Sequence, residues 1–409
     1  MNVDDINFKK FPNNPVVNQN FTNYLEQSSW IINTQMMGLL IGGIIWGVLG
    51  DIKGRTKILI WSILLYSVCN FLTSYVVSIE SYCWLRFFTG IGLAGELGAG
   101  ITLVAEFLPK NKRGIGTSIV AAVGILGCVL AYYINVFLNL DWSAYYQYIP
   151  NTYEEWLKNN DGWRISYQFG GFLGLCLLAL RIKIIDADMF KNVKENKNIQ
   201  KGNFFKFFTN KKLFSSYIFS IFLGLPSWFI VGILVTQCDN IGLHLGIQNL
   251  ENGKAVFYSY IGLSVGDFIA GYICQFFQSR KKTILTYYLL SIIGIILYFS
   301  PLNNSLNSMY IISGYLGLST GFWAVFNTMA AEQFGTNMRA TAATTIPNMV
   351  RGSLYLANFL FLSFFPHLFS ADVIYSAIFT GFVFYVLSFL ALYFIKETYH
   401  KNLDYIEPL

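Results

Sequence analysis

A short charged segment lies between two apolar stretches, each long enough to cross a lipid bilayer. It spans residues 47–57 and reads GVLGDIKGRTK. Its three basic side chains predict a cytoplasmic location, because cytoplasmic loops of membrane proteins carry an excess of Lys and Arg. Gly47 and Gly50 allow a neighbouring helix to approach closely, and Gly54 allows the positive φ of a tight turn. The segment therefore predicts a polytopic membrane protein and its orientation.

The composition agrees with this prediction. Of the 409 residues, 54% are hydrophobic and 12% are charged, whereas soluble domains carry about 25% charged residues. Most of the 28 Lys and Arg lie in loops on the side of residues 47–57, so the net charge of +6 indicates topology and not a nucleic-acid partner. The six cysteines have no paired spacing, which predicts neither a disulfide framework nor a metal site, and no cofactor is implied. Residues 1–28 are polar and lack the apolar core of a secretory signal peptide.

Eleven membrane-spanning helices are expected if each crossing takes about 20 residues. Their predicted ranges are 30–49, 58–78, 82–107, 115–137, 163–181, 214–236, 255–276, 284–299, 308–332, 344–364 and 373–395. An odd number of crossings places the start of the chain outside and its C-terminus in the cytoplasm. The expected domains are an outer loop of residues 1–29, an N-terminal bundle of 30–183, a cytoplasmic linker of 184–213, a C-terminal bundle of 214–396 and a cytoplasmic tail of 397–409.

An internal repeat supports the division into two bundles. Glu106, six residues and Arg113 recur 226 positions later as Glu332, six residues and Arg339. The basic run that begins at Arg55 recurs 225 positions later from Arg280. Transporters are often built from two such related halves. The same offset places the counterpart of the helix at 214–236 at or before residue 1, so we expect the first helix of the first half to be missing from this chain.

The spacing Gly-x-x-x-Asp-x-x-Gly-Arg over residues 47–55 resembles the loop between helices 2 and 3 of the major facilitator superfamily of secondary transporters. Residues 86–96, 162–181 and the tail at 396–404 resemble the metabolite:proton symporter branch, which includes carriers for proline and betaine, citrate and oxoglutarate. The resemblance implies an all-α fold of two helical bundles that rock around a central site. Residues 121–128 lack the Gly-Pro-x-x-Gly-Gly pattern of drug:proton antiporters, which argues against drug export. In the second half, Gln275 lies near the place of Asp51 and Ser279 stands in place of the second glycine, so a weaker ion-pair network is expected there.

Four charged residues are predicted within the membrane, where each costs about 2.5 to 3.5 kcal/mol and usually marks a substrate or proton pathway. Glu96 and Asp267 are candidate proton-carrying groups; the alternative is that each makes a structural hydrogen bond among neighbouring glycines. Arg86 lies in the outer turn of its helix and could instead be a surface anchor. Arg351 follows Asn348 in its helix, and we expect it to meet a substrate carboxylate, Glu96 or Asp267.

A second group of charges is predicted at the cytoplasmic mouth. In sugar carriers and their relatives, the repeated Glu, six residues, Arg pattern contributes to an inner salt-bridge network, so we expect these residues to hold the two bundles closed on the inside. Asp51 could also cap the positive end of a helix. The alternative is that the charges are only topology anchors. The predicted gate residues are Asp51, Arg55, Glu106, Arg113, Arg280, Glu332 and Arg339.

These observations predict a secondary active transporter in a bacterial cytoplasmic membrane. We expect it to be monomeric and to couple protons to the uptake of a small organic solute, such as an amino acid or an organic acid. The alternatives are a facilitator or exporter of the same superfamily, or a transport-dead remnant or sensor. No cluster of His, Asp, Ser or Cys at catalytic spacing appears, so an enzyme is not expected.

Overall fold

The computed structural model describes residues 15–108, 112–138, 162–181, 203–369, 372–401 and 405–407, with only the backbone at 15–29 and at a few further helical positions that include Glu106 and Arg113. In these ranges the chain is helical and forms no strand. Eight of the described helical segments are long and apolar enough to cross a membrane. The predicted count of eleven crossings, the orientation and the missing first helix stay predictions.

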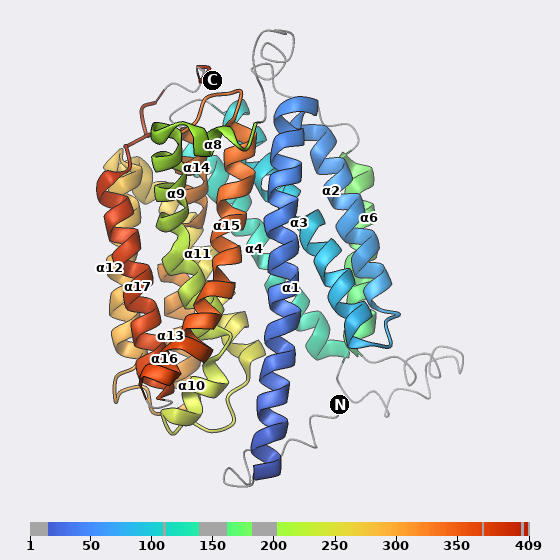
Figure 1. Ribbon diagram of the computed structural model, residues 1–409, viewed down its shortest axis with the longest axis vertical. Coiled ribbons are helices and arrows are strands. Elements are labelled where there is room, and N and C mark those ends of the chain that lie inside the picture. Colours follow the sequence, from blue (N-terminus) through green and yellow to red (C-terminus); the bar gives the residue numbers. More distant parts are fainter. Residues whose placement is uncertain are drawn as a thin grey trace.

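The first group of helices coincides with the first five predicted crossings (Figure 1). It consists of α1 (Pro15–Lys53), α2 (Arg55–Thr73), α3 (Ile79–Phe107), α4 (Arg113–Leu138) and α6 (Gly162–Arg181). The turn between α1 and α2 is made by Gly54, whose φ of 108° is readily adopted only by glycine.

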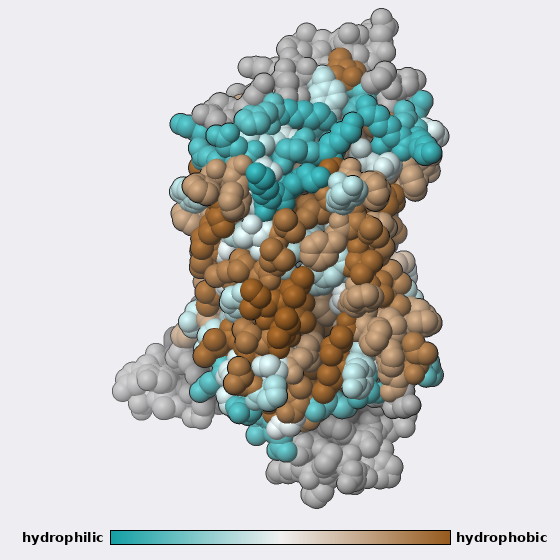
Figure 2. Space-filling view, turned by 90° about the vertical axis from the view of Figure 1, so that its left-hand side faces the viewer, coloured by the Kyte–Doolittle hydropathy of each residue, from teal (hydrophilic) through white to brown (hydrophobic). Residues whose placement is uncertain are grey.

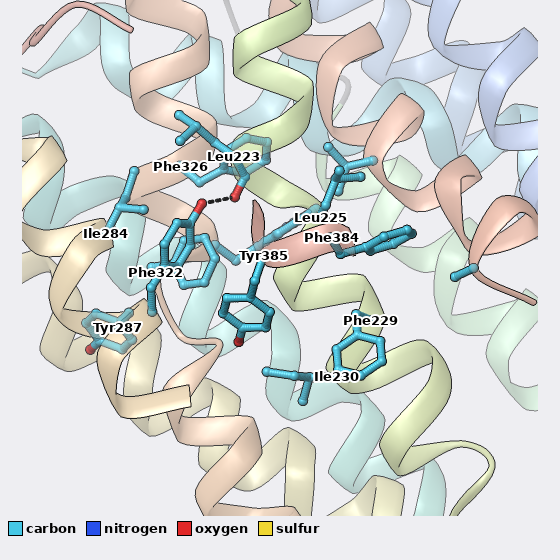
Figure 3. Close-up of a cluster of buried hydrophobic side chains, with 14 of the residues drawn as sticks. Leu223, Leu225, Phe229, Ile230, Ile284, Tyr287, Phe322, Phe326, Phe384 and Tyr385 are labelled. Carbon is cyan, nitrogen blue, oxygen red and sulfur yellow. Dashed lines mark hydrogen bonds between the residues drawn. The ribbon is translucent and has the colours of Figure 1, made fainter. Parts of the chain in front are cut away.

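The second group coincides with the remaining six predicted crossings and contains most of the buried apolar core. It consists of α8 (Lys206–Thr209), α9 (Lys211–Phe229), the π-helix η4 (Ile230–Val235), α10 (Cys238–His244), α11 (Asn252–Phe277), α12 (Arg280–Tyr298), α13 (Leu306–Ser319), α14 (Trp323–Glu332), α15 (Arg339–Phe359), the π-helix η5 (Leu360–Phe364), α16 (Phe365–Leu368) and α17 (Val373–Phe394). Figure 3 shows Phe322 and Phe326 packed near Leu223 of α9 and Tyr385 of α17.

Two helix boundaries differ from the sequence-based expectation. α1 begins at Pro15 and not near residue 30, so the expected outer loop is helical over its second half. Proline is well suited to the first helical turn because its missing N–H would have no partner there. The predicted helix at 308–332 is broken into α13 and α14 by residues 320–322.

The two groups meet mainly along two pairs of helices, α1 with α15 and α11 with α4, with further contacts of α3 with α15 and of α4 with α14. α1 begins and α17 ends at opposite ends of the molecule (Figure 1). An apolar band covers the middle of the face shown in Figure 2, and hydrophilic residues gather at its upper end. This arrangement is that of a membrane-spanning bundle, with more hydrophilic residues at the upper end of this face than at the lower.

Candidate functional site

Asp51 connects the two halves at the charged end of the molecule. Its carboxylate accepts hydrogen bonds from the backbone N–H groups of Ala340 (3.0 Å) and Thr341 (2.8 Å) and from the Thr341 hydroxyl (2.7 Å). The side chain is buried and therefore replaces the water that these donors would otherwise bind. Asp51 thus caps the N-terminus of α15, the kind of helix-capping contact anticipated from its sequence position.

Gly47 of α1 allows the close approach that this cap needs. A Cβ atom placed on Gly47 would lie 3.0 Å from the Cα atom of Thr341, too close for an ordinary side chain to fit without movement. One placed on Gly50 would lie 3.4 Å from the Cβ of Ala340, an ordinary contact distance. Both glycines thus face the first turn of α15, and Gly47 is the one that the close packing requires.

The second half contains a buried ion pair of its own. The guanidinium of Arg280 donates to both oxygens of Glu332, with Nε to Oε2 at 2.7 Å and Nη2 to Oε1 at 2.8 Å. In the first half, the Arg55 guanidinium lies 3.9 Å from Asp51. The bidentate geometry is the stronger of these two contacts. The side chains of Glu106 and Arg113 lie outside the described part, so the expectation of a weaker network in the second half stays a prediction.

The internal repeat is visible in the backbone. Glu106 is in the last turn of α3 and Arg113 begins α4, just as Glu332 ends α14 and Arg339 begins α15. Arg339 is buried at the start of α15, next to the residues that Asp51 caps. The four residues of the repeat therefore lie at equivalent helix ends at the predicted inner mouth.

The sequence reasoning missed Glu397, which caps α12. Its carboxylate accepts hydrogen bonds from the backbone N–H groups of Arg280 (3.0 Å) and Lys281 (3.1 Å) and from the hydroxyl of Ser279 (2.5 Å). Burial disfavours the charged carboxylate, but the hydrogen bonds from Ser279 and the backbone prevail and lower the pKa of Glu397 below its ordinary value of 4.5. The serine that replaces the second glycine of the turn could have signalled this contact.

The tail following α17 continues along the loop between α14 and α15. Thr398 donates its hydroxyl to Glu332 (2.8 Å), and the N–H of Thr336 donates to the carbonyl of Tyr405 (2.9 Å). Lys401 donates to the carbonyl of Gln333 (3.0 Å). The tail is thus joined to the segment that leads into the capped start of α15.

Asp267 makes the contact that its structural alternative predicted. Its Oδ1 accepts a hydrogen bond from the N–H of Ala324 (2.9 Å) in the first turn of α14, while its Oδ2 is buried without a partner. The adjacent Gly266 is required because its Cβ would lie 2.3 Å from the carbonyl oxygen of Leu318. Asp267 therefore stabilises the helix that restarts after the break at 320–322.

Arg86 is engaged within the first bundle. Its guanidinium donates to the hydroxyl of Tyr167 in α6 and lies 5.6 Å from the centre of the Tyr82 ring. Tyr82 and Tyr167 also share a hydrogen bond of 2.8 Å. This contact joins α3 to α6, so Arg86 is neither a simple surface anchor nor paired with the other predicted pathway residues.

Arg351 and Asn348 lie where α15 approaches α14 and α3. Arg351 Nη1 donates to Asn348 Oδ1 (3.3 Å), and Asn348 Nδ2 donates to the carbonyl oxygen of Ala94 in α3 (3.1 Å). The guanidinium lies 5.8 Å from the centre of the Trp323 ring, and Tyr260 of α11 is close enough to interact with its charge. In the described part of the chain, no carboxylate lies within 4 Å of Arg351, so neither Glu96 nor Asp267 forms the expected ion pair.

Glu96 is half buried in α3, two residues beyond the carbonyl that Asn348 contacts. The glycines before it bring α3 against its neighbours: a Cβ on Gly92 would lie 2.6 Å from the Tyr66 nitrogen, and one on Gly95 would lie 2.8 Å from the Cβ of Ser62. Glu96 and Arg351 therefore belong to neighbouring helices without being directly paired.

Comparisons with known proteins agree with this architecture. One similar solved structure is that of the proton:xylose symporter XylE with 6-bromo-6-deoxy-D-glucose bound. The two sequences are 16% identical, and the structures superpose with a TM-score of 0.68 over 98% of this chain and 93% of that chain. This likeness shows the fold. A Bacillus subtilis protein described as "Putative niacin/nicotinamide transporter NiaP" is 24% identical over 78% of this chain and 74% of its own length. The 3-(3-hydroxy-phenyl)propionate transporter of Escherichia coli is 22% identical over 78% of this chain and 73% of its own length.

The family match covers most of the helices described above. Residues 11–354 match the Major Facilitator Superfamily. This range includes the α1–α2 turn, both copies of the repeat and Arg351. The resemblance seen in residues 47–55 is confirmed, and the chain belongs to the Major Facilitator Superfamily.

Proposed function

We propose that this transporter couples protons to the uptake of a small organic acid or amino acid across a bacterial cytoplasmic membrane. The observation that carries the proposal is the guanidinium of Arg351, which has no carboxylate partner among the described residues. A permanently charged group within a membrane bundle needs a counter-charge. A substrate carboxylate would supply it.

The surroundings of Arg351 support a carboxylate substrate with an apolar or aromatic body. A planar guanidinium binds a carboxylate through two parallel hydrogen bonds, and the Trp323 ring beside it offers a face for stacking. The names of two relatives, a niacin/nicotinamide transporter and a 3-(3-hydroxy-phenyl)propionate transporter, are in keeping with this chemistry. They favour an organic acid over an amino acid.

Glu96 is the proposed proton-carrying group. It is half buried in α3, a helix that contacts α15 through the Ala94–Asn348 hydrogen bond, so its charge could affect the Arg351 site. Asp267 is a weaker candidate, because one of its oxygens already caps α14. The contact between Asp51 and α15 is the proposed inner gate, which would close the cytoplasmic side while the central site faces outward.

Uptake by right-side-out vesicles tests the proposal. Vesicles with an imposed proton gradient would be offered a panel of radiolabelled organic acids and amino acids. We expect accumulation of a carboxylate substrate, its loss in Arg351→Gln, and partial recovery in Arg351→Lys because the positive charge returns without the planar fork. Accumulation that needs a gradient of another ion would refute proton coupling. Accumulation that survives in Arg351→Gln would refute the role of Arg351 in substrate binding.

Glu96→Gln separates a symporter from a facilitator. A coupled symporter should lose accumulation against a gradient but retain exchange of labelled for unlabelled substrate, because the neutral side chain no longer carries a proton. Unchanged accumulation would show that Glu96 is not the coupling group. Asp267→Asn provides the comparison, since its remaining oxygen can still cap α14.

A further inference from the structure

We infer that Asn327 of α14 is a second recognition point of the Arg351 site and binds a hydrogen-bonding ring atom or substituent of an aromatic carboxylate. This inference rests on the proposed function and narrows its substrate class. A residue of this kind would decide which ring systems the transporter accepts.

The Asn327 side chain is buried and unsatisfied. It is 2% exposed, and neither Nδ2 nor Oδ1 has a hydrogen-bond partner. In the described part of the chain, no other Asn or Gln side chain has both of its polar atoms fully buried and unpaired. Buried amides are almost always hydrogen-bonded, so an amide with two free polar atoms calls for a partner that is absent from this state.

The neighbouring polar residue shows that this is not a general property of α14. The hydroxyl of Thr328 donates to the carbonyl of Ala324 (2.8 Å) and lies 3.0 Å from the hydroxyl of Thr117 in α4. Thr328 therefore has partners both within its helix and across the junction with the first bundle. The side chain of Asn327, one residue before Thr328, has no hydrogen-bond partner.

The helix geometry directs Asn327 toward the same site as Arg351. Asn327 follows Trp323 by four residues, so the two side chains share one face of α14 about 6 Å apart along its axis. Thr328 faces α4 and Phe326 faces Gly224 of α9, and the Trp323 and Asn327 face lies between those two directions. The Arg351 guanidinium lies over Trp323. Arg351, Trp323 and Asn327 thus follow one another as a charge, a ring face and an amide.

This order of groups matches a planar aromatic acid. The guanidinium would bind the carboxylate, the indole would stack on the ring, and the amide would pair with a ring nitrogen or a ring hydroxyl. An amide has both a donor and an acceptor, so it can serve either substituent. A ring without such a group would leave the amide unpaired, and sites of this kind reject such analogues strongly.

Binding of three acids to the purified full-length protein in lipid nanodiscs tests the inference. The probes are benzoate, which has no polar ring group, nicotinate, which has a ring nitrogen, and 3-hydroxybenzoate, which has a ring hydroxyl. The wild type should bind at least one of the two substituted acids about tenfold more tightly than benzoate. In Asn327→Leu this preference should fall to about one, with benzoate affinity kept or improved. An unchanged preference in Asn327→Leu would overturn the inference.

Thermal stability without ligand gives a second readout. Replacing an unsatisfied amide by an apolar group of similar size should leave the melting temperature unchanged or raise it. The matched control is Asn303→Leu, because Asn303 is equally buried but donates to Tyr298 (2.8 Å) and accepts from Ser308 (3.0 Å). Asn303→Leu should lower the melting temperature and keep the ligand preference. A lowered melting temperature in Asn327→Leu would show a structural role and also overturn the inference.

Arg351→Gln separates the two proposals. Loss of all three acids in Arg351→Gln together with an unchanged preference in Asn327→Leu would leave the proposed function standing and reject the role of Asn327. Equal binding of the acids by the wild type and Arg351→Gln would reject the carboxylate site itself and the inference that rests on it.

Discussion

The two junctions between the bundles are related by the internal repeat but are built differently. At the α1–α15 junction, Asp51 binds the amides of Ala340 and Thr341 across the interface. At the α11–α4 junction, the corresponding stretch of α11 carries the exposed residues Gln275 and Phe276. Among the residues whose side chains the structure describes, Asp51 has no charged counterpart in α11 that binds the start of α4.

The second junction is held by small residues and hydroxyl groups. A Cβ on Gly271 would lie 2.9 Å from the Cβ of Ser118 in α4, and the hydroxyl of Ser264 donates to the carbonyl of Ala122 (2.8 Å). Within the second half, the guanidinium of Arg280 pairs with Glu332 of the same bundle. We infer that opening the α1–α15 junction costs more, because it removes the acceptor of two backbone N–H groups and a hydroxyl.

The largest effect is expected for the ion pair inside the second bundle. Arg280→Met leaves Glu332 buried without its partner, which should destabilise the fold by about 3 to 5 kcal/mol. Chemical unfolding in detergent measures this loss. The double variant Arg280→Met, Glu332→Leu should recover much of it, because no unpaired charge remains. If the double variant is as unstable as Arg280→Met, the unpaired charge of Glu332 is not the cause of the loss in stability.

Replacing Asp51 should shift the equilibrium between the inward-closed and inward-open conformations. Asp51→Ala leaves two α15 amides and the Thr341 hydroxyl without their acceptor, a cost of about 2 to 3 kcal/mol to the closed inner side. The variant should therefore populate the inward-open state more. A cysteine introduced at the buried position Thr344 should then react faster with a thiol reagent added from the cytoplasmic side. Equal labelling rates in both proteins would contradict a gating role.

The Glu397 cap of α12 should have a smaller effect that depends on pH. Its pKa in the folded protein is below the ordinary 4.5, so its stabilisation is present above about pH 4.5 and is lost as the pH falls through the folded-state pKa. At pH 7, Glu397→Gln should lower stability by about 1 kcal/mol, as for other helix caps. Melting curves at pH 7 and at pH 3.5 test this. If the difference in melting temperature between wild type and Glu397→Gln is as large at pH 3.5 as at pH 7, the charge of Glu397 is not the source of the stabilisation.

The smallest effect is expected at the counterpart of Asp51. Gln275→Ala changes an exposed side chain and should shift stability by no more than about 0.5 kcal/mol. It should also leave the labelling of the cysteine at position 344 unchanged. This variant is the matched control for Asp51→Ala, and an equally large response in both would remove the proposed difference between the junctions.

Some of the candidate site could be predicted from sequence and some could not. The glycines at 47 and 50, the capping potential of Asp51 and the helix-end positions of Glu332 and Arg339 follow from local spacing. The bidentate pairing of Arg280 did not, because its partner Glu332 lies 52 residues later in the chain and the packing of α12 against α14 brings the two together.

Local sequence features were enough to predict a membrane transporter with an internal repeat. Apolar length, the placement of Lys and Arg, and the repeat are properties of short segments, and they constrain which segments become helices. Three features became visible only in the folded protein. Asp267 caps α14, the tail residue Glu397 caps α12, and the Asn327 side chain has no hydrogen-bond partner. These outcomes depend on hydrogen-bond geometry between helices far apart in the chain, which close packing sets and local spacing does not encode.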